Sequence, residues 1–318
     1  MIGVAGAGAF GTALAIAEAI GGREVRLWGR DATAMAAAER SRTTPHLPGA
    51  ELPSGLACTA ELAALSGAEA LLLVVPAQAT AGFLAEHGAR LPDAPLVLCA
   101  KGIDARDFRL QSEIAAAALP QTTVAALTGP GFAGEIAAGL PTALTLACAD
   151  AGTGRALQAA LSTARLRLYL TDDVTGAELG GALKNVVAIG CGLIEGARLG
   201  ASARAALMTR GFAEMTRLAT ALGARPETLA GLSGLGDLSL TCGSPQSRNF
   251  RLGQALGAGA ARPGGTVEGV ATARAACRLG AEHGVELPIA AAVADVLEGR
   301  LTVEGAMAAL LSRPLKSE

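Results

Sequence analysis

IGVAGAGAFGTALAIAEAI, residues 2–20, is the stretch of sequence that decides the fold. It predicts a short apolar strand at Ile2–Ala5, then the loop Gly6-Ala7-Gly8-Ala9-Phe10-Gly11, then an apolar helix at Thr12–Ile20. In a G-x-G-x-x-G loop the first glycine permits a tight turn, the second lets a pyrophosphate approach the backbone, and the third lets helix and strand pack closely. The unpaired N–H groups at the start of the helix attract phosphate. We therefore expect a dinucleotide-binding site here.

Further apolar segments follow through the first half of the chain, separated by helical stretches. They are Glu24–Trp28, Leu71–Val75, Leu96–Cys99, Val124–Leu127, Thr142–Ala147 and Leu166–Leu170. Strands of this kind are typical of a parallel sheet that helices cover on both faces. With right-handed crossovers they predict a Rossmann-like, doubly wound, mostly parallel α/β domain at residues 1–175.

The sequence pattern changes near Thr171-Asp172-Asp173. A chain of 318 residues suits two domains, and beyond this point we expect helices and no strand. Clusters of Gly, Pro and Ser, as at Gly231–Gly236, separate the helical segments. These are Ala177–Leu199, Ala203–Leu222, Val270–His283, Ile289–Leu297 and Thr302–Leu311. We therefore expect an all-helical substrate-binding and catalytic domain at residues 176–318.

Composition excludes several classes of function. The net charge is −2 and aromatic residues make up 3%, so the charge and stacking signatures of nucleic-acid binding are missing. The six cysteines show no CxxC spacing, which argues against a zinc site and favours buried thiols in a reducing compartment. No charge-free apolar run is long enough to span a bilayer. No Lys or Arg precedes the apolar N-terminal segment, so we expect part of the fold there rather than a signal peptide.

The residues after the second strand bear on the choice of cofactor. Arg30 comes first and would hold the 2′-phosphate of NADP(H), whereas Asp31 would bind the ribose of NAD(H). The alternative is an arginine that is simply solvated. We expect NADP(H), with NAD(H) also accepted.

Oxidation of an alcohol releases a hydride and a proton, so a dehydrogenase needs a base. No histidine stands beside an obvious catalytic partner. Lys101 follows a predicted strand at the carboxyl edge, where ligands of α/β sheets bind. Lys184 is a single cation in an apolar helical segment, which is costly unless it faces a polar cleft. Burial and neighbouring positive charge lower the pKa of a lysine, which suits a base. The alternative for Lys184 is a surface side chain with its stem along the helix.

Taken together, the segments resemble bacterial NAD(P)-dependent glycerol-3-phosphate dehydrogenase. The matching stretches are GAGAFGTALA (6–15), LWGR (27–30), HLPG (46–49), VVP (74–76), AKG (100–102), TGPGFAGEIAAGLPTA (128–143), ELGGALKNVVAIG (178–190), ASARAALMTRG (201–211), LSGLGDLSLTC (232–242), SPQSRN (244–249) and VEG (267–269). The resemblance implies a cytoplasmic enzyme that interconverts sn-glycerol 3-phosphate and dihydroxyacetone phosphate with NAD(P)(H) and without a metal. It also implies a supply of glycerol 3-phosphate for phospholipid synthesis. Oligomeric state stays open, with a homodimer among the alternatives.

The resemblance also implies roles for single residues. Lys184 would be the general base, Asp237 would orient it, and Lys101 would contact substrate and cofactor. The implied substrate-binding residues are Lys101, Gly129, Gly131, Lys184, Asn185, Asp237, Ser247, Arg248 and Asn249. The implied cofactor-binding residues are Gly6, Gly8, Ala9, Phe10, Gly11, Arg30, His46, Lys101, Ala133, Arg248 and Glu268.

Three positions depart from the family pattern. Gly131 stands where Ser or Thr is common, so a hydroxyl contact to substrate is lost or replaced by water. His46 stands where an aromatic is usual, which puts that ring's cofactor contact in question, and Ala9 replaces a common Ser.

Two other functions stay open at this stage. The first is a β-hydroxy-acid dehydrogenase of similar two-domain build, which would not need Ser247-Arg248-Asn249 to bind phosphate. The second is a non-catalytic NADP(H)-sensing protein, which would need no lysine in its cleft.

Overall fold

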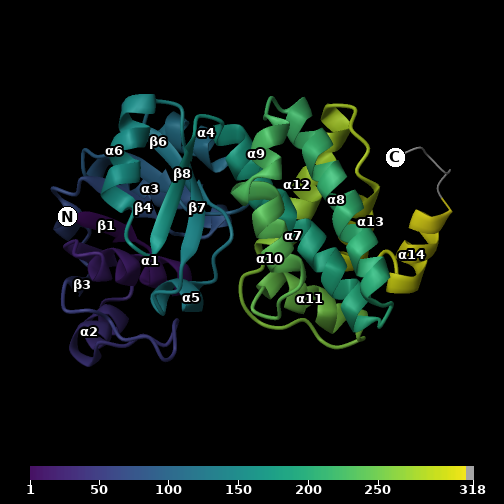
Figure 1. Ribbon diagram of the computed structural model, residues 1–318, viewed down its shortest axis with the longest axis horizontal. Helices are drawn as coiled ribbons and strands as arrows, with labels where there is room; N and C mark the ends of the chain where they lie inside the picture. The colour runs from purple at the N-terminus through teal and green to yellow at the C-terminus, as the bar shows by residue number, and fades with distance from the viewer. Residues whose placement is uncertain (313–318) are drawn as a thin grey trace. The chain divides into compact units, whose positions relative to one another are not determined.

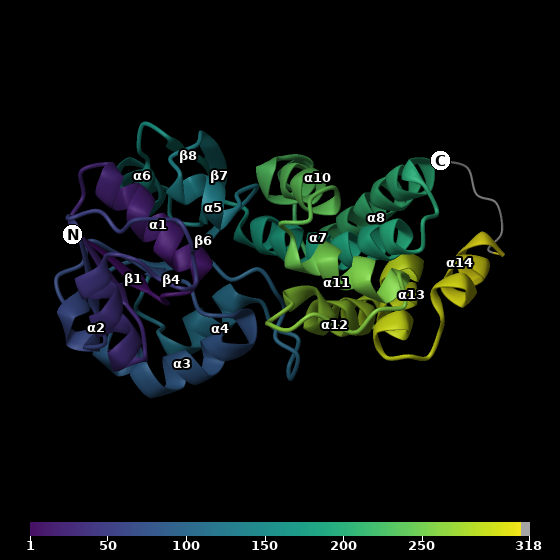
Figure 2. The same cartoon turned by 90° about the horizontal axis from the view of Figure 1, so that it is seen from below.

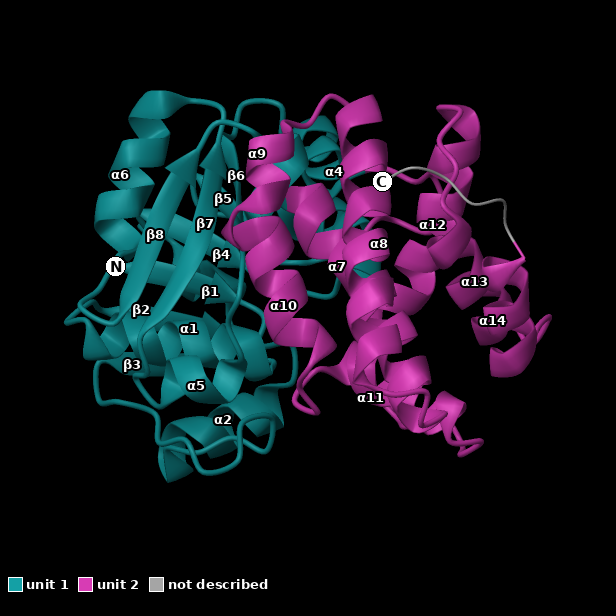
Figure 3. Ribbon diagram, turned by 45° about the vertical axis from the view of Figure 1, so that its right-hand side comes forward, with its two compact units in different colours: residues 1–101, 110–177 teal, residues 102–109, 178–318 magenta. Residues whose placement is uncertain are grey.

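A computed structural model of the chain describes residues 1–312. These residues form two compact units, which Figure 3 shows in different colours. Unit 1 comprises residues 1–101 and 110–177, and unit 2 comprises residues 102–109 and the chain from residue 178 onward. The short segment 102–109 thus groups with unit 2, although it precedes the predicted boundary after residue 175. Residues 313–318 of the predicted second domain lie outside the described residues.

Unit 1 is built on one eight-stranded sheet with helices on both faces (Figures 1 and 2). In spatial order the strands are β3 (Leu56–Thr59), β2 (Val25–Trp28), β1 (Ile2–Ala5), β4 (Ala70–Leu73), β5 (Leu96–Leu98), β6 (Val124–Thr128), β7 (Thr142–Cys148) and β8 (Leu166–Thr171). Strands β1 to β6 pair in parallel, in the order of a doubly wound dinucleotide-binding fold. Only β7 pairs antiparallel, with β6, and β8 runs parallel to β7. The predicted fold class is confirmed.

Each face of the sheet has its own apolar core, because successive strand residues point to opposite faces. On β4, Ala70 and Leu72 contribute to one core, and Leu71 and Leu73 contribute to the other. The first core lies under helices α1 (Ala9–Ile20), α2 (Ala32–Ser41), α5 (Ala133–Ala137) and α6 (Ala151–Leu161). The second lies under α3 (Thr80–His87) and α4 (Gln111–Ala118). Two covered faces explain why the central strands are almost continuously apolar.

Unit 2 is helical, and no strand occurs among the described residues after Thr171, as predicted. Its helices are α7 (Val174–Gly196, which begins in unit 1), α8 (Ala201–Ala221), α9 (Pro226–Ala230), α10 (Asp237–Cys242), α11 (Arg248–Gly257), α12 (Glu268–Glu282), α13 (Pro288–Leu297) and α14 (Val303–Leu311). A π-helical turn at Leu232–Gly236 precedes α10. The sequence marks this turn only as a glycine-rich separator.

Helices α7 and α11 pack backbone against backbone. A Cβ atom added at Gly253 of α11 would lie 2.0 Å from the carbonyl oxygen of Ile189, and one added at Gly257 would lie 2.2 Å from that of Leu193. The contact is reciprocal, because a Cβ added at Gly196 of α7 would lie 2.1 Å from a carbonyl oxygen of α11. Glycine on both helices therefore sets their separation.

Helix α7 is long and apolar enough to cross a bilayer by length and composition alone. Its most apolar 18-residue window is, however, wholly buried inside the protein. That burial is typical of the core helix of a soluble protein.

Candidate active site

The glycine-rich loop of unit 1 has the geometry that its spacing predicts. Gly6 has a φ of 126°, and an added Cβ would lie 2.5 Å from the carbonyl oxygen of Val74. At Gly11 an added Cβ would lie 2.0 Å from the carbonyl oxygen of Gly6. Gly8 differs, since an added Cβ would meet nothing within 4 Å. Open space there, beside a helix start without a side-chain cap, fits an approaching pyrophosphate.

Arg30 and Asp31, the two residues considered for cofactor choice, follow β2 and differ in their hydrogen bonding. Arg30 is exposed. The carboxylate of Asp31 accepts a hydrogen bond from the N–H of Ala34 at 3.0 Å and so caps α2. One carboxylate oxygen of Asp31 is therefore already engaged at the start of α2.

Lys101 links predicted cofactor-binding and substrate-binding residues within unit 1. Its Nζ donates a hydrogen bond to the carbonyl oxygen of Gly129 at 2.7 Å. The same nitrogen lies 5.8 Å from the centre of the Phe10 ring, within the range of a cation–π contact. Gly129 has a φ of 125°, a conformation that favours glycine. The structure thus brings these three residues together at the carboxyl edge of the sheet.

The other predicted site residues of unit 1 are less constrained. At Gly131 an added Cβ would lie 3.0 Å from Ile136 Cδ1, so apolar side chains occupy the direction of the missing hydroxyl. Ala133 begins the short helix α5, whose N-cap Phe132 supplies no side-chain hydrogen bond. His46 is exposed on the segment between α2 and β3.

The ammonium group of Lys184 is buried in unit 2, in a cluster of three polar side chains. Its Nζ lies 3.0 Å from Oδ1 of Asp237 and donates a hydrogen bond to Oγ1 of Thr241 at 2.7 Å. The Thr241 hydroxyl also lies 3.1 Å from Oδ1 of Asp237. The side chain of Lys184 is 8% exposed, so the snorkelling alternative is wrong. A buried amine held by a carboxylate and a hydroxyl is suited to proton transfer.

Thr241 is a site residue that the sequence reasoning missed. It lies four residues after Asp237 on the same helix, and residues at this spacing share a helix face. That spacing was the available signal, although it gains meaning only once Lys184 is known to face α10.

A second set of buried polar groups begins at Asn185, the neighbour of Lys184 in the sequence. The amide of Asn249 donates to Oδ1 of Asn185 at 2.8 Å, and its oxygen accepts from the N–H of Gly269 at 3.0 Å. These bonds join α7, the start of α11 and the start of α12. Glu268, half-buried at the first position of α12, is thereby held near the same group of side chains.

The start of α11 carries the predicted phosphate-binding residues. Ser247 is buried and caps the helix, since its Oγ accepts from the N–H of Phe250 at 3.2 Å. Arg248, the first helical residue, is exposed. A guanidinium beside free N–H groups at a helix start is suited to a phosphate.

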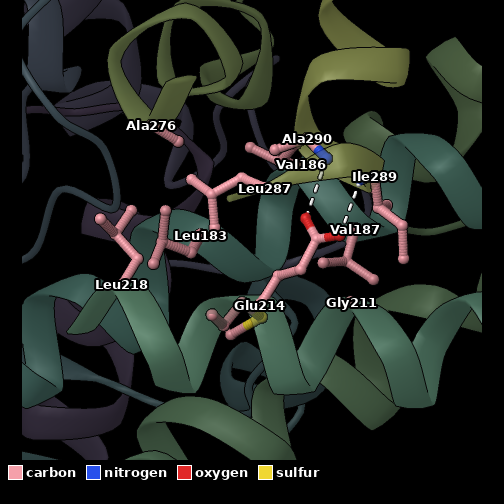
Figure 4. A pocket seen from close by; sticks show the side chains of 11 residues that line it. Leu183, Val186, Val187, Gly211, Glu214, Leu218, Ala276, Leu287, Ile289 and Ala290 are labelled. Carbon is pink, nitrogen blue, oxygen red and sulfur yellow. Dashed lines mark hydrogen bonds between the residues drawn. The ribbon is translucent and has the colours of Figure 1, made fainter. Parts of the chain in front are cut away.

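A small apolar cavity lies behind α7 within unit 2 (Figure 4). Leu183 and Val186 line it from α7. The carboxylate of Glu214, from α8, accepts hydrogen bonds from the N–H groups of Ile289 at 2.7 Å and Ala290 at 3.2 Å. It therefore caps α13, a role for which a carboxylate is well suited. The carboxylate that lines this cavity is thus engaged at the start of α13, and most of the other lining side chains are apolar.

Two buried cysteines, Cys99 in unit 1 and Cys242 in unit 2, have raised thiol pKa values. Burial raises the pKa of the Cys99 thiol to about 12, and the Cys191 side chain and burial hold the pKa of Cys242 far above its usual value. Both thiols are therefore protonated near neutral pH and are poor nucleophiles. Within residues 1–312, no group of three or more His, Cys, Asp or Glu side chains is placed to hold a metal ion.

Comparison with protein families gives two matches that together span most of the chain. The model described as NAD-dependent glycerol-3-phosphate dehydrogenase N-terminus matches residues 1–153, and the corresponding C-terminus model matches residues 173–308.

Curated relatives and solved structures indicate the same family as these two matches. Glycerol-3-phosphate dehydrogenase (NAD(P)+) of Paracoccus denitrificans is 59% identical, with 100% of this chain and 99% of the relative covered. The enzyme of Ruegeria sp. is 56% identical with the same coverage. The crystal structure of glycerol-3-phosphate dehydrogenase from Coxiella burnetii has 37% identity and a TM-score of 0.93, with 98% of each chain covered. A D-mandelate dehydrogenase structure, at 16% identity and a TM-score of 0.64 over 96% of this chain and 99% of that one, shares the fold alone.

Proposed function

Because the chain belongs to the NAD-dependent glycerol-3-phosphate dehydrogenase family, we propose that it interconverts sn-glycerol 3-phosphate and dihydroxyacetone phosphate. The reaction is a hydride transfer that uses NADP(H) or NAD(H). The observation that carries the proposed chemistry is the buried cluster of Lys184, Asp237 and Thr241.

In this proposal Lys184 moves the proton of the C2 hydroxyl. In its ammonium form, with the Asp237 carboxylate 3.0 Å away, the side chain donates this proton when the ketone is reduced. In the oxidising direction the amine takes the hydroxyl proton. Asp237 balances the charge, and Thr241 fixes the nitrogen by accepting one of its hydrogens. Both neighbours thereby keep the nitrogen in one orientation.

The phosphate of the substrate is assigned to the start of α11. Arg248 supplies a planar, permanently charged donor, and Ser247 supplies a hydroxyl hydrogen while its oxygen caps the helix. Asn249 and Asn185 hold that helix start against α7 through their shared hydrogen bond. Lys101, beside Gly129, supplies positive charge for the substrate oxygen.

The open face of Gly8 and the uncapped start of α1 support the assignment of a nicotinamide dinucleotide to this loop of unit 1. When bound, the cofactor supplies the hydride in reduction and accepts it in oxidation. The open face of Gly8 and the backbone of Ala9 would hold its pyrophosphate, Gly6 and Gly11 would give the loop its tight shape, and Arg30 would hold a 2′-phosphate. Phe10, His46, Ala133, Arg248 and Glu268 complete the proposed cofactor contacts.

The wider assignments follow from the family. Residues 1–175 serve as the dinucleotide-binding domain and residues 176–318 as the helical substrate and catalytic domain. The enzyme acts in the cytoplasm and supplies glycerol 3-phosphate for phospholipid synthesis, and a homodimer is one alternative for its oligomeric state.

A spectrophotometric assay at about 340 nm tests the proposal, because only the reduced nicotinamide absorbs there. Dihydroxyacetone phosphate should oxidise NADPH in the presence of the protein. Lys184→Ala should lower kcat by roughly 100- to 10,000-fold while NADPH binding, followed by fluorescence, survives. Near-normal turnover of the variant would remove Lys184 from proton transfer. A panel of β-hydroxy acids separates the alternative dehydrogenase, which would turn them over and ignore the triose phosphate.

A further inference from the structure

The segment between α2 and β3 forms a closed loop with His46 near its tip. The backbone joins its two ends, since the N–H of Leu52 donates to the carbonyl oxygen of Arg42 at 2.8 Å. The Arg42 side chain makes a second bond between the two ends of the loop, since its Nε donates to the carbonyl oxygen of Leu52 at 3.2 Å. Residues 43–51 are thus held at their base by one residue.

The guanidinium of Arg42 makes more contacts than loop closure requires. Its Nη2 donates to the carbonyl oxygens of Pro53 and, at 2.6 Å, of Leu56 in β3. Its Nη1 lies 3.2 Å from Glu39 Oε1, and the other oxygen of Glu39 accepts from the N–H of Cys58 at 2.6 Å. One side chain therefore joins the end of α2, the end of the loop and the first residues of the edge strand.

Arg42 also has an unusual backbone conformation. Its φ is 55°, in the left-handed region that residues other than glycine seldom adopt. This conformation ends α2, and the N–H of Arg42 still donates to the carbonyl oxygen of Ala38. The three side-chain bonds to carbonyl oxygens compensate for a turn that a glycine would form more easily.

The loop is anchored on the same core as the glycine-rich loop. Leu47 and Leu52 are 7% and 2% exposed and belong to the apolar cluster that also contains Met35. Phe10 packs against that cluster. His46 is nevertheless exposed, on a segment whose two flanks are fixed.

We propose that Arg42 is a positioning residue for the cofactor, because it holds the His46 loop closed before the cofactor arrives. This inference rests on the proposed function, which assigns His46 to the cofactor site. An open loop would have to be ordered on binding, and that ordering lowers affinity. A loop that is already closed avoids this loss, so Arg42 acts on cofactor affinity and not on the reacting atoms.

The first test compares Arg42→Gln and Arg42→Lys with Arg40→Gln, which alters an exposed arginine on the same helix. The dissociation constant of NADPH is measured by fluorescence titration, and steady-state kinetics are measured in parallel. We expect Arg42→Gln to raise the dissociation constant about tenfold. The kcat at saturating NADPH and the KM for dihydroxyacetone phosphate should stay unchanged. Arg42→Lys should recover part of the affinity, and Arg40→Gln should match the wild type.

A double-mutant cycle with His46→Ala gives the second test. If Arg42 acts through the His46 loop, the two substitutions together weaken NADPH binding by less than the product of their separate factors. An unchanged dissociation constant in folded Arg42→Gln, or fully multiplicative effects, would overturn the inference. Should Arg42→Gln fail to fold, Arg42→Lys decides by the same two criteria. Failure of the wild type to reduce dihydroxyacetone phosphate would instead count against the proposed function, since the NADPH titration does not depend on turnover.

Discussion

Glu18 gives the sharpest prediction about stability, through the substitution Glu18→Gln. It lies on α1 with 1% of its surface exposed, and its Oε2 atom has no hydrogen-bond partner within the described residues. Burial raises the pKa of this carboxyl from 4.5 to about 8, although the charge of Arg23 acts in the opposite direction. Glu18 is therefore neutral in the folded protein at neutral pH, and charged once the chain unfolds.

The sign and size of the effect follow from these two pKa values. The pKa of Glu18 is higher in the folded than in the unfolded chain. The free energy of unfolding is therefore not reduced by this group below about pH 4.5, and it falls as the pH rises toward about 8. One pKa unit corresponds to about 1.4 kcal/mol, so the complete loss approaches about 5 kcal/mol. This is an upper value, since water that enters on ionisation reduces the cost. Glutamine has the same shape and does not titrate.

Urea unfolding of the wild type and Glu18→Gln at several pH values between about 4 and 9 measures the effect. The free energy of unfolding of Glu18→Gln, relative to that of the wild type, should increase as the pH rises. This difference should level off above about pH 8. Glu24→Gln, at an exposed glutamate, should show no such trend. A constant difference between Glu18→Gln and the wild type over the whole range would refute the reasoning, because it would mean that Glu18 titrates normally.

Three further outcomes are expected. Arg248→Ala should raise the KM for dihydroxyacetone phosphate roughly 10- to 100-fold and the KM for NADPH by a smaller factor, since the proposed charged donor to the substrate phosphate is removed. An unchanged KM for dihydroxyacetone phosphate in steady-state assays would exclude Arg248 from the phosphate site. Asp237→Asn should lower kcat roughly 100-fold and leave NADPH binding intact, because the charge opposite the buried amine is lost; pre-steady-state rates at saturating substrate check this. Gly253→Ala should destabilise the protein by about 3 kcal/mol or prevent folding, since the new Cβ would lie 2.0 Å from the Ile189 carbonyl oxygen. Gly264→Ala is the control, because a Cβ at Gly264 would meet nothing within 4 Å. This control should unfold at the same urea concentration as the wild type.

Much of the fold could be predicted from the sequence, because the central strands are buried on both faces. An apolar run such as Leu71–Val75 is easy to identify for that reason. The edge strand β3 was missed, since Leu56–Thr59 has one buried residue and little apolar periodicity. Helix α11 was also missed, because it begins in a polar stretch and depends on Ser247 as its cap.

The candidate site was less accessible to sequence reasoning. The loop around Gly8 could be predicted because its geometry is local. The contact between Lys184 and Thr241 joins residues 57 apart, and the bond between Asn185 and Asn249 joins residues 64 apart. No spacing rule within one element reveals such contacts. They depend on how α7, α10 and α11 pack, which the sequence alone did not specify.

The glycine contact between α7 and α11 has a mechanical consequence. Side chains normally separate two packed helices, and a shift of one helix against the other is accommodated by changes of side-chain rotamer. Here the two main chains touch directly, so we expect α7, which carries Lys184, and α11, which begins with Arg248, to move together. Amide hydrogens of α7 and α11 should exchange with deuterium more slowly than those of any other helix pair in the described part of unit 2.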